Sequence, residues 1–125
     1  MAASALFMAA IGISLTFLPK EISNMIGAGY ISNIPIALQL SGALYFAFAM
    51  LNWMAKGAII GGIYNKPIAT ANLTHFFIGA LALIKALLNN HTLPYGSWIL
   101  AGIYSVFAIC FGLIFYRHPG SDKAV

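Results

Sequence analysis

Charged residues are scarce in this chain, and acidic residues are almost absent. Only 6% of its 125 residues are charged, and Asp and Glu together occur twice. A soluble domain has about 25% charged residues. So few charges could not keep the surface of a small folded chain hydrated, and a disordered chain needs low hydrophobicity. The composition therefore excludes the soluble globular and disordered classes of protein.

Cysteines and clusters of positive charge are also lacking. The single cysteine, Cys110, has no partner in the chain, which excludes a disulfide-stabilised scaffold. The net charge of +4 comes from Lys and Arg residues that are scattered singly along the sequence. Scattered cations do not form a patch that could follow a phosphate backbone. We therefore expect no nucleic-acid partner.

The residue sets that most catalytic and metal sites require are missing too. Glu21 follows the first apolar run and Asp122 lies in the C-terminal tail, so neither acid is expected at membrane depth. Carriers coupled to protons or sodium usually need an Asp or Glu near the middle of the membrane. The sequence also has no His-x-x-x-His motif, no Cys-x-x-Cys motif and no pair of carboxylates. We expect no catalytic residues, no metal ligands and no cofactor.

Long apolar runs punctuated by proline are what the sequence does contain. Hydrophobic residues make up 62% of the chain, and prolines lie at the ends of the apolar runs: Pro19, Pro35, Pro67, Pro94 and Pro119. Proline is tolerated in the first turn of a helix or just after its end. This pattern predicts helices over about 2–18, 35–56, 67–88 and 94–116, followed by a tail over 117–125. The last three reach the roughly 20 residues that cross a bilayer, and the first is near the lower limit of about 17.

These runs predict an all-α polytopic membrane protein. We expect one domain, a four-transmembrane-helix bundle, with a short interfacial segment between the first two helices that includes one short helix ending at Gly27. The lipid bilayer is then the surrounding medium. Lys and Arg are enriched on the cytoplasmic side of membrane proteins. This rule places both termini in the cytoplasm, because four cations then lie inside and two outside. We expect the membrane to be the cell (inner) membrane. The inside residues are Lys56, Lys66, Arg117 and Lys123, and the outside residues are Lys20 and Lys85.

Each predicted span carries a stripe of small or polar residues at helical spacing. Small residues on one face mark contacts between membrane helices, so the stripes predict a tight bundle. The stripes are Ala5, Ala9, Gly12 and Thr16; Gly42 and Ala49 with Ser41 beside them; Asn72, Gly79, Ala82 and Ala86; and Ala101, Ser105, Ala108 and Gly112.

One group of polar residues is a candidate ligand or headgroup site. Asn52 and Lys56 are one turn apart near the end of the second predicted span, and Asn72 and His75 are one turn apart near the start of the third. The connecting turn would bring these two ends together near the cytoplasmic surface. One interpretation is a shallow site for an anionic headgroup or ligand. The other is structural, with the amides bonding across helices, His75 neutral and Lys56 reaching the headgroups. Gln39 is a further candidate for bonding between helices, as is Ser41.

Two short motifs carry a resemblance to a known group of proteins. They are Phe17-Leu18-Pro19 at the exit of a short first helix, and 51–56 (Leu-Asn-Trp-Met-Ala-Lys) followed by His75 early in the third. In these features the chain resembles small bacterial membrane proteins with the outline of the DoxX-like four-helix families. The resemblance implies the four-helix architecture. It implies no activity for any residue.

Three functions remain open from the sequence. The first is a non-catalytic membrane protein that works by packing, as a homo-oligomer or with other membrane subunits of a complex. The second is a carrier or channel for a small neutral, lipophilic or anionic solute, using the group at Asn52, Lys56, Asn72 and His75. The third is a membrane enzyme acting on a lipid-soluble substrate, with His75 as acid–base.

Overall fold

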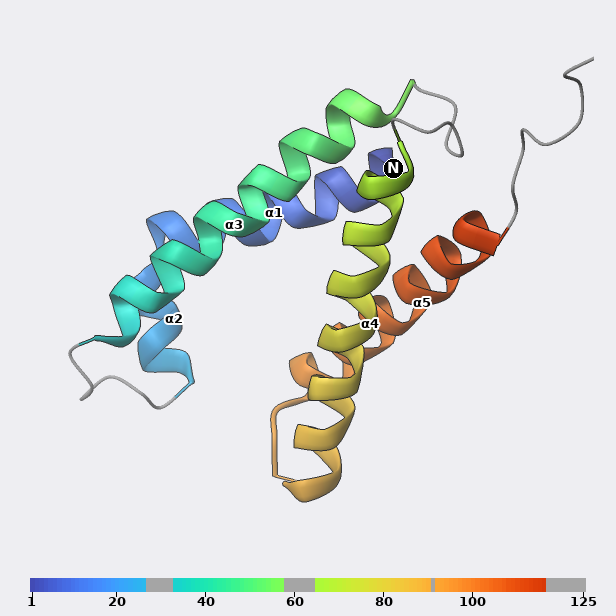
Figure 1. The fold of residues 1–125 in the computed structure, drawn as a ribbon. Coiled ribbons are helices and arrows are strands. Elements are labelled where there is room, and N and C mark those ends of the chain that lie inside the picture. Colours follow the sequence, from blue (N-terminus) through green and yellow to red (C-terminus); the bar gives the residue numbers. More distant parts are fainter. Residues whose placement is uncertain (27–32, 58–64, 91, 117–125) are drawn as a thin grey trace, which may run out of the picture. The chain divides into compact units, whose positions relative to one another are not determined.

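The computed structural model describes residues 1–26, 33–57, 65–90 and 92–116. In this part of the chain the regular secondary structure is entirely helical (Figure 1). The helices are α1 (Ala2–Phe17), α2 (Pro19–Met25), α3 (Ile34–Ala55), α4 (Lys66–Asn89) and α5 (Tyr95–Tyr116). The predicted tail over 117–125 lies outside the described residues.

The chain divides into two compact units, which we describe separately. The first unit covers Met1–Gly57 and contains α1, α2 and α3, with α1 lying alongside α3 (Figure 1). The second unit covers Ala58–Val125 and contains the helical hairpin of α4 and α5.

The break between α1 and α2 is caused by Pro19. Proline has no backbone N–H and disfavours a helical conformation in the preceding residue. Leu18 accordingly leaves the helical region, with φ −120° and ψ 41°, although its N–H still bonds to the Ser14 carbonyl at 2.9 Å. Pro19 then opens α2, whose axis is bent by 93° from that of α1.

Three of the helices are long and apolar enough to cross a membrane: α3, α4 and α5. The helix α1 has 16 residues, below the length needed on its own, and a fourth span is obtained only when α1 and α2 are counted together as one bent span. These helices identify the chain as a membrane-spanning protein by length and composition.

The short helix α2 occupies part of the predicted interfacial segment. Pro19 and Ser23 are buried on the side of α2 that packs in the first unit, whereas Met25 is 86% exposed. The predicted end at Gly27 lies outside the described residues, and α2 ends at Met25.

The first unit is held by a close approach of two glycines. A Cβ on Gly12 would lie 2.8 Å from the backbone nitrogen of Phe46 and 2.9 Å from the Gly42 carbonyl oxygen. A Cβ on Gly42 would lie 2.5 Å from the Thr16 hydroxyl oxygen. Backbone contact of this kind is how membrane helices gain packing energy without a hydrophobic driving force. The small-residue stripes predicted on these two helices therefore face each other.

In the second unit, large and small side chains alternate across the interface. The face of α4 that is buried consists of Ala69, Asn72, Phe76, Ala80 and Leu87, and that of α5 consists of Ala101, Tyr104, Ala108 and Phe111. Phe76 stacks on Phe111 with ring centroids 5.7 Å apart, and the Tyr104 ring fills the space that a Cβ on Gly79 would occupy. The predicted stripe on α4 is only partly the contact face, because Ala82 and Ala86 are exposed on another side of the helix.

We predict that Gly12→Ala and Gly42→Ala each destabilise the first unit. Overpacking a close contact costs about 1–3 kcal/mol, and the obstructing atoms here include backbone atoms that cannot rotate away. The matched control is Gly112→Ala in α5, where the new Cβ would meet only Leu73 at 3.8 Å. Titration of the purified protein with a denaturing detergent measures the effect. Equal stability of all three variants would contradict the contact.

Candidate functional site

Asn52, the first of the four predicted site residues, lies inside the first unit. It is 0% exposed, and its side-chain amide faces α1. The amide nitrogen donates to the Ser4 hydroxyl at 3.2 Å and to the Met8 sulfur at 3.7 Å. Ser4 in turn donates to the Met1 carbonyl at 2.8 Å. Asn52 therefore joins α3 to the start of α1 through buried polar atoms.

Lys56 lies one turn beyond Asn52 but points elsewhere. It is exposed at the end of α3, and its ammonium nitrogen lies 3.1 Å from the centroid of the Trp53 ring. This is a cation–π contact, which at exposed sites contributes about 0.5–1 kcal/mol. The cation is thus held against the side of α3.

Asn72 and His75 belong to the second unit. Asn72 is buried and donates to the Ile68 carbonyl of its own helix at 2.9 Å. The His75 ring lies 3.3 Å (Nε2 to Oη) from the Tyr104 hydroxyl, and it packs edge-on against Phe76. His75 is therefore part of the contact between α4 and α5.

The four predicted residues are thus divided between the two units, with Asn52 and Lys56 in the first and Asn72 and His75 in the second. Each of these four side chains contacts neighbours within its own unit. The idea that the pairs meet in one site stays a prediction. Within the described ranges, no three His, Cys, Asp or Glu side chains are grouped so as to hold a metal ion.

The hydroxyl groups of the helices bond mainly to their own backbone. Ser14, Thr16, Thr70 and Ser105 each donate to the carbonyl four residues earlier, at 2.7–2.8 Å. Ser41 does the same with Ala37 at 2.9 Å, and its predicted bond to another helix stays a prediction. Gln39 does reach across, donating to the Thr16 carbonyl at 3.5 Å, which is a long hydrogen bond.

The structure also has a surface groove between α1 and α3, which the sequence did not predict. Its volume is about 240 Å³, and it is lined by Ala5, Leu6, Ala9, Phe46, Ala49, Met50 and Trp53. The alanines form a low floor and the four larger side chains form the walls. These residues belong to two helices, so their meeting along one groove depends on how the helices pack and not on any local motif. Lys56, which lies over Trp53, is at one end of this groove.

No protein-family model, curated protein or solved structure matches the chain.

We predict that Asn52 and Ser4 are energetically coupled. A double-mutant cycle with Asn52→Ala and Ser4→Ala should give a coupling energy on the order of 0.6 kcal/mol, with about 1.7 as the upper bound for such bonds in membranes. Unfolding by a denaturing detergent supplies the four stabilities. In the control cycle, Ser14→Ala replaces Ser4→Ala, because the Ser14 hydroxyl is exposed and bonds to Ala10 of its own helix. The control pair should be additive, and an equal coupling in both cycles would refute the bond.

Proposed function

We propose that this chain is a non-catalytic integral membrane protein that acts by helix packing, as a homo-oligomer or as an accessory subunit of a membrane complex. In this proposal α1 makes the fourth crossing, α2 lies at the membrane surface, and both termini face the cytoplasm from the cell (inner) membrane. The orientation is supported by Lys56 and Lys66, which lie at the end of α3 and the start of α4.

The observation that carries the proposal is a second apolar face on α5. Away from the buried residues of α5, exposed residues recur at intervals of three and four: Ile99, Gly102, Val106, Ile109 and Leu113. We call this face the outer seam of α5. Such spacing keeps one side of a helix continuous, and a small residue within it lets another helix approach closely. A Cβ on Gly102 would meet nothing within 4 Å, and Gly102 also lines a pocket with Leu87 and Leu88 of α4, so the outer seam is open where it borders α4.

The polar side chains support a packing role as well. A carrier of solutes needs polar groups that face a passage, and an enzyme needs them against a substrate. Asn52 and Asn72 are instead buried and bond to protein atoms, and His75 lies against Tyr104. The carrier and enzyme alternatives consequently have less support than packing.

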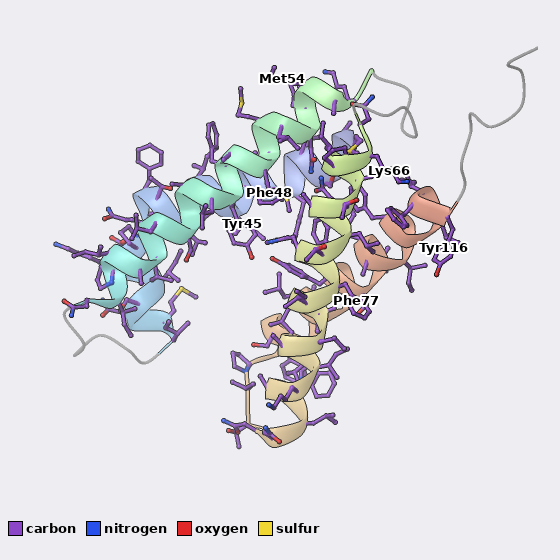
Figure 2. The ribbon with its side chains drawn as sticks, viewed as in Figure 1. Tyr45, Phe48, Met54, Lys66, Phe77 and Tyr116 are labelled. Carbon is purple, nitrogen blue, oxygen red and sulfur yellow. The ribbon has the colours of Figure 1, made fainter. Side chains whose placement is uncertain are left out.

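Exposed side chains occur on the other helices too. Figure 2 shows Met54 on α3 and Phe77 on α4, which are 79% and 53% exposed. Apolar side chains facing lipid are ordinary for a membrane protein. What distinguishes the outer seam is therefore its glycine and not its hydrophobicity.

The native cysteine tests the proposal. Cys110 is exposed and directly follows Ile109 of the outer seam, so a membrane-permeable bis-maleimide should link two copies in native membranes through this residue. Gly102→Leu should reduce the crosslinked fraction, because bulk at the seam costs packing energy and each 1.4 kcal/mol lowers association about tenfold. Gel analysis of the labelled membranes gives the fraction.

Ala82→Leu is the matched control, since Ala82 is also small and exposed but lies on α4. It should leave crosslinking unchanged. A crosslink to a different protein, again lost in Gly102→Leu, would indicate the accessory-subunit form. A chain that stays monomeric in native membranes and purifies without a partner would refute the proposal.

A further inference from the structure

The groove between α1 and α3 has the dimensions of a site for one lipid chain. It extends along α3 from Phe46 to Trp53. At 1.5 Å per residue this is roughly 10 Å. One leaflet contributes about 15 Å of hydrocarbon, half of the roughly 30 Å core. The groove therefore runs along most of the depth of one leaflet.

The lining of the groove is apolar, and its shape comes from the difference in size between its alanines and its larger side chains. Ala5 and Ala49 are buried at its floor, whereas Leu6 and Met50 stand at its edges, 62% and 47% exposed. A flat floor between taller walls accepts a narrow, flexible, apolar chain. The buried Asn52 bonds toward Ser4 and Met8 and adds no polar group to the lining.

The charge at one end selects the kind of lipid. Lys56 lies at the end of α3, with its ammonium nitrogen 3.1 Å from the centre of the Trp53 ring that forms the last wall. An ammonium group has three N–H donors, so contact with the ring leaves it able to bind a phosphate. The cation is thus placed where the headgroup of a lipid in the groove would emerge.

A transmembrane helix is a poorer occupant than a lipid. A helix that covered the groove and continued past Trp53 would cover Lys56, and burying a charge is costly unless an opposite charge pairs with it. A second copy of this chain brings only two acids, Glu21 and Asp122. Glu21 lies in α2, which continues from the end of α1 where Thr16 meets Gly42, whereas Lys56 is at the opposite end of the unit, where Ser4 meets Asn52.

We propose that the α1/α3 groove binds one acyl chain of an anionic phospholipid, whose phosphate pairs with Lys56. In the predicted orientation the Lys56 end faces the cytoplasmic leaflet, where anionic lipids are enriched. The site is independent of the outer seam of α5, which lies in the other unit. Each basic residue near an anionic membrane surface gains on the order of 1 kcal/mol. At 1.4 kcal/mol per factor of ten, this corresponds to about a fivefold preference for an anionic headgroup.

Trp53 itself is the reporter for the test. The chain has two tryptophans, so Trp98→Phe leaves Trp53 as the only one. Bromine atoms on an acyl chain quench tryptophan fluorescence at close range. The full-length Trp98→Phe protein is reconstituted into phosphatidylcholine vesicles that contain increasing amounts of either brominated phosphatidylglycerol or brominated phosphatidylcholine. We expect phosphatidylglycerol to quench Trp53 at about one fifth of the concentration.

Two further variants separate the headgroup contact from the groove. Lys56→Gln should bring the two quenching curves together, whereas Lys66→Gln, which removes a cation at the start of α4, should leave them apart. Ala9→Phe fills the groove and should weaken quenching by both lipids. Trp53→Phe leaves Trp98 as the reporter in the other unit, and the same Lys56→Gln change in that background should not alter its emission if the fold is intact.

Three results would overturn the proposal. Equal quenching of Trp53 by both lipids would show that the groove does not select an anionic headgroup. A preference that survives Lys56→Gln would place the selective contact elsewhere. Absence of quenching by either lipid, with Trp98 still quenched, would mean that protein and not lipid covers the groove.

Discussion

The close approach of α1 and α3 at Gly12 and Gly42 is the contact on which the first unit depends. The helix α1 has 16 residues and the chain turns by 93° into α2, so neither the length of α1 nor its continuation fixes its position. Backbone contact at the two glycines does so, since a Cβ on either would lie within 3 Å of the opposite helix. The same alignment brings Ser4 opposite Asn52 and sets Ala5 and Ala49 side by side in the groove. The buried polar bond and the groove therefore both depend on one close contact.

The polar residues of the helices are accommodated by short-range bonding. Hydrocarbon offers no hydrogen-bond partners, so each polar group needs one from the protein. Thr16 and Ser105 use the carbonyl four residues earlier, and Asn72 does likewise. Asn52 bonds to Ser4 and Met8, which are on another helix. A side chain that bonds to its own helix adds little to the tertiary structure, whereas Asn52 specifies how α1 and α3 are aligned.

The sequence predicted where the helices begin better than which of their faces meet. The prolines place three helix starts to within one residue, because the constraint of a missing N–H is local: α3 starts at Ile34, α4 at Lys66 and α5 at Tyr95. The contact face of α4 was harder to predict. Small size alone selected Ala82 and Ala86, but the α4–α5 interface pairs Gly79 with the ring of Tyr104 and stacks Phe76 on Phe111. Complementarity of large and small side chains involves both helices, and a stripe on one helix cannot contain it. For the same reason, neither the groove nor the direction of the Asn52 side chain could be predicted from the sequence.

The outer seam of α5 and the α1/α3 groove are both exposed and apolar, but among the residues that the structure describes only the groove has a charged residue at one end. The outer seam of α5 runs from Ile99 to Leu113 and has a glycine with open space around it, so a second helix can approach along its length without covering a cation. The α1/α3 groove is bounded at one end by Lys56 over Trp53. An occupant of the groove must therefore be apolar beside Trp53 and anionic beside Lys56, which lies about one helical turn further on. A phospholipid meets this requirement because its apolar acyl chain is followed by an anionic phosphate. A transmembrane helix would need an acidic side chain at one position to do the same. With only two acids in the chain, a second copy of this protein is the less suitable occupant.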